Sequence, residues 1–440
     1  MSPSVFAKQG NSESVQGITK ISVSGYKSLD EECSIEVRPL TILAGANSSG
    51  KSSIMQPLLL MKQTLEATYD PGALLLNGPN VKFTWAKQLL SQFSGKSNTD
   101  RFTIQVEING NYYFRNVFQE EPNQGIDIIE TYLLGGNQEI RIYKDMTHEE
   151  FMSSIPEWLK DFSKLDIGRG CKWTSIRRRC FLEPNFEPLS TTFNFSSNFQ
   201  TSIRKLLHVP GLRGNPERTY PITAIGSEFP GTFENYVASV VNHWQENEDT
   251  RLEELSKALK TLGLTSKIGA RRVNDVQIEL RVSRLPGSND ISDMVNIADV
   301  GIGVSQVLPV LVALLVAEPE QLVYLEQPEI HLHPRAQANL AEILADAAKR
   351  GVRVVLETHS DLLLRRIQSL VAEDKISPDK VKLHWFRRKE DGVTQVNSAD
   401  LTDAGAFGDW PEDFGDVALQ EESRYLDAAE KRSLQAVSSL

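Results

Sequence analysis

The residues best suited to chemistry lie between positions 45 and 52, where the chain reads Gly-Ala-Asn-Ser-Ser-Gly-Lys-Ser. This run matches the phosphate-loop pattern G-x-x-x-x-G-K-[ST] at every fixed position. Its glycines let successive backbone N–H groups point at phosphate oxygens, and the positive end of a following helix adds to the attraction. The spacing predicts a site for a nucleoside triphosphate, formed by Gly45, Ala46, Asn47, Ser48, Ser49, Gly50, Lys51, Ser52 and Ser53.

Two side chains of this loop have definable tasks. Lys51 is expected to reach the β- and γ-phosphates, and the Ser52 hydroxyl is expected to ligate Mg²⁺. An apolar run over residues 40–44 predicts a strand before the loop, and an amphipathic pattern over residues 54–65 predicts a helix after it. A chance match in a Gly/Ser-rich turn is the alternative, and the strand, loop and helix context argues against it.

Composition limits the class of protein without indicating a function. The chain has 440 residues and a net charge of −11, so nucleic-acid binding would require a local basic patch on an acidic body. Its three cysteines lack paired C-x-x-C spacing, which favours a reducing cytoplasm over disulfides or zinc. The longest apolar run, residues 307–317, is about half of a membrane-spanning helix. We therefore expect a cytoplasmic protein with no membrane segment.

Hydrophobic patterns predict the elements around the loop. Strands are expected over residues 18–26 and 33–37, followed by a hairpin of residues 102–108 and 111–118 that turns at Asn109-Gly110. Later in the chain, strands alternate with helices, which predicts a parallel sheet. The strands are expected at 276–282, 321–325 and 352–357, and the helices at 301–317, 335–347 and 362–372. Between these regions, helices are expected over 232–245 and 251–262, without the sustained heptads of a long coiled coil.

Two later segments carry further chemistry. Residues 321–329, Gln-Leu-Val-Tyr-Leu-Glu-Gln-Pro-Glu, resemble a Walker B segment, in which an apolar strand ends in acidic residues that face Mg²⁺ and the attacking water. Thr358-His359-Ser360, after the next predicted strand, resembles the switch histidine of ABC-type ATPases. The order and spacing of these segments are those of that class.

With residues 299–309, 326–334 and 357–360, the chain resembles a bacterial branch of the ABC-type, SMC-like AAA ATPases that carries a short C-terminal domain of unknown function. Trp-Pro-Glu-Asp-Phe at 410–414 fits this branch, and the resemblance covers about residues 18–95 and 280–415. It implies an α/β fold, an ABC-type P-loop NTPase head with an antiparallel β lobe, a parallel-sheet core and an inserted helical arm. The expected divisions are a flexible tail (1–17), the head (18–129), the arm (130–270), the head again (271–375) and a small C-terminal domain (376–440).

Catalytic roles follow from this resemblance residue by residue. Glu326 takes the Mg²⁺-facing Walker B position, and Gln327 takes the position of the usual catalytic glutamate. Glutamine can orient water but cannot act as a general base, which predicts slow hydrolysis unless Glu329 substitutes. The alternative is an ordinary ATPase in which Glu326 is the base and Mg²⁺ is held mainly by Ser52 and water. His359 is expected to sense the γ-phosphate.

Other motif residues are assigned less sharply. In the signature segment, residues 299–309, Gly303 aligns with the second glycine of the common Leu-Ser-Gly-Gly-Gln motif. Gly301 then stands where a serine normally contacts the γ-phosphate of the nucleotide bound by the opposing subunit. Ser305 or backbone N–H groups at the helix start could supply this contact instead. Gln88 and Gln92 are both candidates for the glutamine loop. His331 and His333 could bind a metal ion, but capping of the next helix and dimer contacts are favoured.

The implied partners are a second copy of the chain, paired head to head and open to further assembly, and a nuclease. Members of the branch resemble the ATPase subunits of two-gene antiphage systems such as the Septu type, and the ~80 residues after His359 are too few for a fused Toprim nuclease, so a separate nuclease is expected. DNA-repair or chromosome-maintenance activity on DNA, and a regulatory scaffold that scarcely hydrolyses ATP, are the competing hypotheses. A basic and aromatic stretch (Lys172, Trp173, Arg177–Arg179) could contact DNA, but a solvated face or an acidic partner within the molecule is the favoured alternative. The loop 212–218 could reach nucleotide, with packing or salt bridging as the alternative.

Overall fold

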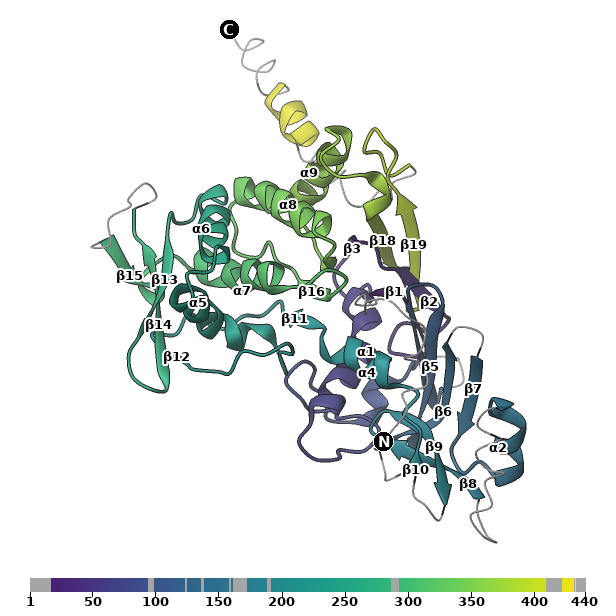
Figure 1. Ribbon diagram of the computed structural model, residues 1–440. Helices are drawn as coiled ribbons and strands as arrows, with labels where there is room; N and C mark the ends of the chain where they lie inside the picture. The colour runs from purple at the N-terminus through teal and green to yellow at the C-terminus, as the bar shows by residue number, and fades with distance from the viewer. Residues whose placement is uncertain are drawn as a thin grey trace.

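The computed structural model describes residues 17–93, 99–122, 125–135, 138–157, 160, 172–187, 191–285, 293–408, 422–430 and 432. Two six-stranded sheets form the centre of this part of the chain, and two smaller sheets lie at its ends (Figure 1). None of its helices combines the length and the apolar character that crossing a membrane requires. The Trp-Pro-Glu-Asp-Phe segment at 410–414 and residues 1–16 of the predicted tail lie outside the described residues.

The first sheet is antiparallel and contains the predicted hairpin. Its order is β2-β1-β4-β5-β6-β7, and β4 and β5 pair from Arg101 to Ile108 with Gln119 to Tyr112, which confirms a turn at Asn109-Gly110. Alternate residues of β4 are buried, as expected for a sheet with one covered face. The strands are β1 (Ile18–Ser24), β2 (Cys33–Glu36), β4 (Arg101–Ile108), β5 (Tyr112–Glu121), β6 (Gly125–Gly135) and β7 (Gln138–Tyr143).

The second sheet is the parallel core that the βαβ pattern predicts. Its order is β11-β16-β17-β3-β18-β19, parallel throughout except for the final hairpin of β18 and β19. The strand before the phosphate loop, β3, therefore lies between β17 and β18. The strands are β3 (Leu40–Gly45), β11 (Leu207–Val209), β16 (Leu322–Glu326), β17 (Arg353–Glu357), β18 (Val381–Arg388) and β19 (Thr394–Asp400).

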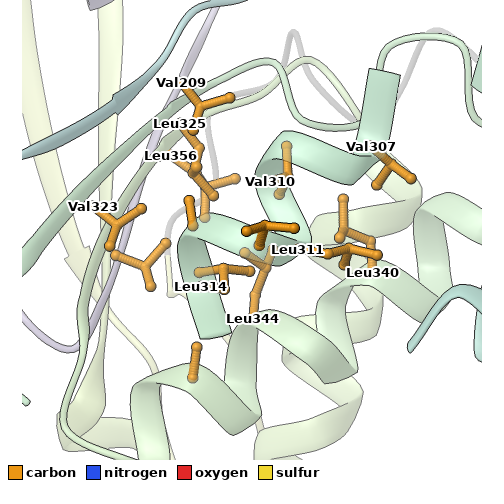
Figure 2. Packing of buried hydrophobic residues seen from close by; sticks show 14 of the residues in the cluster. Val209, Val307, Val310, Leu311, Leu314, Val323, Leu325, Leu340, Leu344 and Leu356 are labelled. Carbon is orange, nitrogen blue, oxygen red and sulfur yellow. The ribbon is translucent and has the colours of Figure 1, made fainter. Parts of the chain in front are cut away.

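Helices cover both faces of this parallel sheet. On one face, α7 packs its side chains against the strands and against α8, with Leu311 and Leu314 near Val323 and Leu344 (Figure 2). Because α7 is apolar on almost all sides, it is buried rather than amphipathic. The opposite face belongs to a second core with α1 and the antiparallel sheet. The helices are α1 (Lys51–Glu66), α2 (His148–Ser154), α4 (Ser197–Arg204), α5 (Val237–Glu246), α6 (Arg251–Thr261), α7 (Ile302–Val316), α8 (Pro334–Lys349) and α9 (Asp361–Ala372).

Residues 130–270 do not form the single inserted arm that was predicted, because they contribute to several sheets. β6 and β7 extend the antiparallel sheet, and β11 is an edge strand of the parallel core. A three-stranded sheet of β8 (Lys172–Arg178), β9 (Phe181–Glu187) and β10 (Thr191–Thr192) lies near the antiparallel sheet (Figure 1). α5 and α6 instead pack with a sheet at the other end of the molecule, formed by β12 (Tyr220–Pro221), β13 (Ile268–Arg272), β14 (Gln277–Ser283) and β15 (Met294–Asn296).

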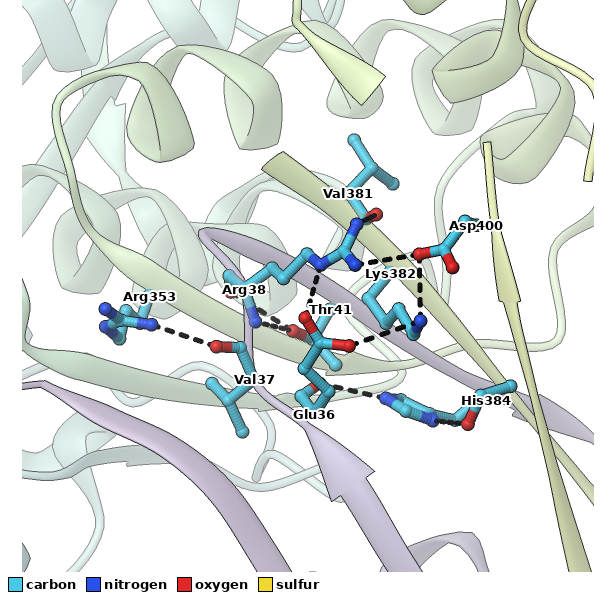
Figure 3. A network of polar contacts seen from close by, with 10 residues as sticks. Glu36, Val37, Arg38, Thr41, Arg353, Val381, Lys382, His384 and Asp400 are labelled. Atoms are coloured by element: carbon cyan, nitrogen blue, oxygen red, sulfur yellow. Dashed lines mark hydrogen bonds and ion pairs between the residues drawn. The ribbon is translucent and has the colours of Figure 1, made fainter. Parts of the chain in front are cut away.

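The start of the predicted C-terminal domain also belongs to the core. β18 pairs with β3 from Val381 to Phe386, so the chain to Asp400 is part of the parallel sheet. A polar network fixes this hairpin to the end of β2 and the residues that follow it: Lys382 bridges Glu36 and Asp400, and Arg38 also reaches Asp400 (Figure 3). His384 lies beneath them, 1% exposed, with Nε2 2.9 Å from the carbonyl oxygen of Glu36. Distant contacts of this kind have no local sequence signal.

Candidate active site

The phosphate-loop sequence folds as a tight turn between β3 and α1. β3 ends at Gly45 and α1 begins at Lys51, so the loop lies at the carboxyl end of a central parallel strand. Gly45 and Gly50 have φ angles of 141° and 101°, a region that strains residues with a Cβ. A Cβ built on Gly45 would also lie 2.2 Å from the carbonyl oxygen of Phe386. The backbone itself therefore requires both fixed glycines of the motif.

Lys51 folds back over this loop. Its Nζ donates hydrogen bonds to the carbonyl oxygens of Gly45 and Ala46, at 2.9 and 2.7 Å. Burial lowers the pKa of the ammonium group, and the negative charges of Glu357 and Glu329 oppose that shift. The ammonium group is thus held against the loop, where phosphate oxygens can replace the two carbonyl oxygens as its partners.

The carboxylate that contacts Ser52 is Glu357, the last residue of β17. Ser52 Oγ donates to Glu357 Oε2 at 2.9 Å, and the Tyr324 hydroxyl donates to Glu357 Oε1. The pKa of Glu357 is raised to about 7, first by burial and then by the charge of Glu326, against the lowering effect of these hydrogen bonds. Glu326 was expected beside Ser52. Glu357 lies there instead because β17 separates β16 from β3.

Glu326 turns towards the edge strand β11. Its Oε1 lies 3.0 Å from His208 Nε2, and its Oε2 accepts a hydrogen bond from the backbone N–H of Gly211 at 3.1 Å. Burial raises the pKa of Glu326, but His208, Gly211 and the charge of Arg213 outweigh burial, so the pKa lies below its ordinary value. Glu326 is therefore an ionised carboxylate, held one strand away from the loop.

Gln327 adopts a backbone conformation that is rare for a residue with a side chain. Its φ is 44°, in the left-handed region. Its N–H donates to the carbonyl oxygen of Glu357 at 2.9 Å, and its own carbonyl oxygen accepts from the Arg213 guanidinium at 3.2 Å. Two neighbouring segments thus hold a strained residue directly after β16, and backbone strain of this kind is common at functional sites.

Glu329 anchors the segment that carries the predicted switch histidine. Its Oε1 accepts hydrogen bonds from the Thr358 hydroxyl at 2.7 Å and from the His359 N–H at 2.8 Å. Glu329 is 6% exposed, and burial raises its pKa against those hydrogen bonds. Burial, followed by the charge of Lys51, lowers the pKa of His359. Glu329 therefore positions His359, which is neutral at physiological pH.

One cavity of about 520 Å³ unites the loop with these strand ends. Gln327, Glu357 and His359 line it, whereas Glu326 and Glu329 are not among its lining residues. Gln88 and Gln92, the two candidates for the glutamine loop, both line the cavity. Gln88 Oε1 accepts hydrogen bonds from the backbone N–H groups of Thr84 and Trp85, at 2.9 and 3.2 Å. The loop residues that line it are Asn47, Ser48, Ser49, Gly50, Lys51, Ser52 and Ser53.

The signature segment lies outside this cavity. Gly301 is exposed and caps the start of α7, and Gly303 packs near the carbonyl oxygen of His331, 3.3 Å from a built Cβ. The Ser305 hydroxyl donates back to the carbonyl oxygen of Ile302 at 2.9 Å. The segment is therefore not assembled with the phosphate loop of its own chain.

Residues from the far end of the chain support the phosphate loop, and local sequence reasoning missed them. The Thr394 hydroxyl donates to the carbonyl oxygen of Ser49 and lies 2.8 Å from the Ser28 hydroxyl. Arg388 donates to the carbonyl oxygen of Ser48 at 3.4 Å and lines the cavity. The sequence could have indicated Glu357 as a site residue, because it ends an apolar strand. Thr394 and Arg388 had none.

Arg213 is the buried cation behind the Walker B segment. It is 9% exposed, and burial lowers its pKa while Glu234, Glu329 and Glu326 oppose that shift. The Gln306 amide, on α7, donates to the carbonyl oxygen of Arg213 at 3.3 Å. Because Arg213 also donates to Gln327, it connects the signature helix with the Walker B segment. Arg218, the other arginine of the loop 212–218, forms an ion pair with Asp299 at 2.7 Å.

The basic stretch near residue 177 is engaged within the molecule. Arg177 pairs with Asp70 at 3.0 Å, Arg178 with Glu183 at 3.3 Å, and Arg179 donates to the carbonyl oxygen of Ala67 at 3.1 Å. Trp173 is 1% exposed and packs against Phe186, so it is not available for stacking on a base. The alternative of internal salt bridges is the one that the structure supports.

The two histidines of the His-x-His segment have separate positions. His333 caps α8, where its Nδ1 accepts from the Arg335 N–H at 3.3 Å, as the favoured alternative predicted. His331 has a φ of 64°. Across the described residues, no group of three or more potential ligands is arranged to hold a metal ion.

Two family models match the chain. Residues 17–167 match the model described as "AAA ATPase domain", and residues 209–365 match the model described as "AAA domain, putative AbiEii toxin, Type IV TA system". The matched regions contain the phosphate loop and the Walker B segment, respectively. The chain thus contains AAA-type ATPase domains. A search of curated proteins gave no match.

Solved SMC head domains are structurally similar at low sequence identity. The SMC head bound to the C-terminal winged-helix domain of ScpA is 12% identical, with a TM-score of 0.47, over 88% of this chain and 99% of that chain. The Thermotoga maritima SMC head is 10% identical, with a TM-score of 0.38, over 87% and 98%. A Pyrococcus furiosus SMC head with an extended coiled coil, bound to the C-terminal domain of ScpA, is 10% identical, with a TM-score of 0.42, over 94% and 100%.

Proposed function

We propose that this protein, which contains AAA-type ATPase domains, binds ATP with Mg²⁺ at the phosphate loop and hydrolyses it slowly. The observation that carries the proposal is that Lys51, Ser52, Glu357 and His359 line one cavity of about 520 Å³. Together with the backbone of the loop, they supply a phosphate cradle, a cation, metal-ligand oxygens and a residue near the γ-phosphate. These are the components that P-loop NTPases use.

The donor atoms present suit Mg²⁺. Ser52 and Glu357 offer a hydroxyl and a carboxylate, and Mg²⁺ prefers such oxygen ligands. Ser49 Oγ in the same loop is buried without a hydrogen-bond partner among the described residues, which leaves a polar atom for a ligand to satisfy. When bound, Mg²⁺ supplies charge stabilisation to phosphate oxygens. We assign Ser52 and Glu357 to hold it, in place of the expected pair of Ser52 and Glu326.

Each of the side chains at the site then has a defined task. Lys51 exchanges its two carbonyl partners for phosphate oxygens. Gln327 and His359 line the cavity and orient the attacking water and the γ-phosphate. The Glu329 carboxylate holds His359 in place by accepting a hydrogen bond from the backbone N–H of His359. Because an amide cannot accept the proton of water as a carboxylate does, hydrolysis is expected to be slow.

A second copy of the chain completes the site. Gly301, Gly303 and Ser305 do not line the cavity, although Gly301 and Ile302 are exposed at the start of α7. Backbone N–H groups at a helix start bind anions. In a head-to-head dimer, this segment of one protomer would cover the γ-phosphate bound by the other.

We further propose that the dimer regulates a separate nuclease in antiphage defence rather than acting directly on DNA. The support is the resemblance to Septu-type ATPase subunits and the engagement of Arg177, Arg178 and Arg179 in internal contacts. The alternative is a DNA-repair or chromosome-maintenance ATPase. A nuclease that copurifies with the protein and loses regulation when Lys51 is replaced would support the first function.

The decisive experiment measures ATP turnover and solution mass together, with and without DNA. We expect slow turnover that DNA does not stimulate, and an ATP-dependent dimer. Lys51→Ala should abolish nucleotide binding and dimerisation, whereas the matched control Lys349→Ala, on the exposed face of α8, should change neither. Full nucleotide binding by Lys51→Ala would overturn the site assignment. Strong stimulation by DNA would favour the repair function.

A further inference from the structure

The order of the strands identifies the end of the cavity where a nucleotide base would lie. β16 and β17 lie on one side of β3, and β18 lies on the other. Gln327 and Glu357 belong to the first side, which is therefore the γ-phosphate side. Arg388, the last residue of β18, lines the cavity on the second side. A nucleotide whose phosphates lie on the loop extends its base towards the end of β18.

The apolar part of the cavity lining occurs at this second side. Among the described residues that line the cavity, Leu90 and Phe93 are apolar, and the others are polar, charged or glycine. Leu90 is 4% exposed, whereas Phe93 is half-buried. A Cβ built on Gly392, in the turn between β18 and β19, would lie 3.4 Å from the Phe93 ring. The Phe93 ring therefore lies beside this turn and in the wall of the cavity.

The backbone just before Phe93, at residues 89–91, is bonded to the segment of residues 25–27. Lys27 N–H donates to the carbonyl oxygen of Leu89 at 2.9 Å, and Ser91 N–H donates to that of Gly25 at 3.0 Å. Tyr26 and Leu90 form an isolated β-bridge between the same segments. Phe93 follows this bonded segment by two residues, so its place beside the cavity is restricted before the ligand arrives, which reduces the ordering cost of binding.

We propose that the base of the bound nucleotide stacks on Phe93, between the segment of residues 90–93 and the turn between β18 and β19. This inference rests on the proposed ATP site and adds the contact by which the protein distinguishes a nucleoside triphosphate from bare polyphosphate. Stacking on an aromatic ring is favourable for any base, because every base has a π face. Phe93 thus selects for a base, and not for one particular base.

The test compares two ligands at the same loop, ATP and inorganic tripolyphosphate, each with Mg²⁺, by calorimetry on the full chain. Wild-type protein should bind ATP more tightly. Phe93→Ala should weaken ATP binding about tenfold and leave tripolyphosphate binding unchanged, whereas Phe93→Trp should preserve both. Phe193→Ala, which replaces a half-buried ring in the aromatic cluster around Trp173, is the matched control and should alter neither affinity.

The outcomes separate this inference from the proposed function. An ATP affinity of Phe93→Ala within twofold of wild type would overturn the base contact, and so would an equal loss for both ligands. Unchanged tripolyphosphate binding shows that the variant is folded at the loop. If wild-type protein bound neither ligand, the ATP site itself would be wrong.

Discussion

The Ser52 hydroxyl donates a 2.9 Å hydrogen bond to Glu357 Oε2, although 305 residues separate the two positions. This contact joins the first turn of α1 to the end of β17. It places a buried carboxylate against the residue that P-loop proteins use for Mg²⁺. Glu326, the carboxylate of the Walker B segment, is instead bonded to His208 and Gly211.

Glu357→Gln is expected to weaken the response to Mg²⁺ more than Glu326→Gln. Loss of a carboxylate at or next to a metal typically costs roughly 10- to 100-fold in metal affinity. Titrating Mg²⁺ at fixed ATP and measuring nucleotide binding gives the midpoint for each variant. Because both substitutions keep the side-chain shape, each serves as the control for the other. A larger shift for Glu326→Gln would return the metal position to the Walker B carboxylate.

Arg213→Ala should destabilise the fold by about 1.5–3 kcal/mol, the usual contribution of a hydrogen bond that involves a charged group. The variant removes the donor to Gln327 and the cation near Glu326, Glu329 and Glu234. Urea unfolding measures the change. Arg218→Ala is the control, because its ion pair with Asp299 is exposed and should contribute about 1 kcal/mol or less. Equal effects of the two variants would contradict a special role for Arg213.

Thr394→Val should weaken ATP binding about fivefold without abolishing it. The substitution keeps the shape but removes the hydroxyl that donates to the carbonyl oxygen of Ser49, and one such hydrogen bond contributes about 1 kcal/mol. Thr261→Val, which removes an exposed hydroxyl on α6, is the matched control. Calorimetry with ATP checks both. Unchanged affinity in Thr394→Val would show that the loop keeps its conformation without this support.

Stability should fall on acidification partly because of His384. Burial lowers the pKa of His384 from 6.5 to about 4 in the folded protein. The unfolded chain therefore takes up the proton first as pH falls below about 6.5, so the stability contribution is lost between pH 6.5 and 4. Near pH 5.5 the loss is about 1.4 kcal/mol, since one pKa unit corresponds to about 1.36 kcal/mol.

His384→Asn tests this contribution. Its unfolding free energy should change less between pH 7.5 and 5.5 than that of wild type, even if the variant is less stable at both values. The exposed His243→Asn variant should behave as wild type does. Urea unfolding at the two pH values supplies the comparison. An identical pH dependence in His384→Asn and wild type would mean that the pKa of His384 is not lowered in the folded protein.

The sequence by itself determined the features that depend on neighbouring residues. The phosphate loop, the hairpin at Asn109-Gly110 and the cap at His333 are short motifs in which the residue types and the backbone angles are local. The alternation of strands and helices likewise predicted a parallel sheet, because burial on both faces produces continuous apolar strands.

Only the tertiary structure decided which distant residues meet at the loop. The order β16-β17-β3-β18 places Glu357 beside Ser52, and Arg388 and Thr394 beside Ser48 and Ser49. The same order makes β18 and β19 part of the core rather than of a separate domain. Strand order is set by the packing of whole helices and sheets, and their contacts join residues far apart in the chain. No spacing within a single segment encodes such an arrangement.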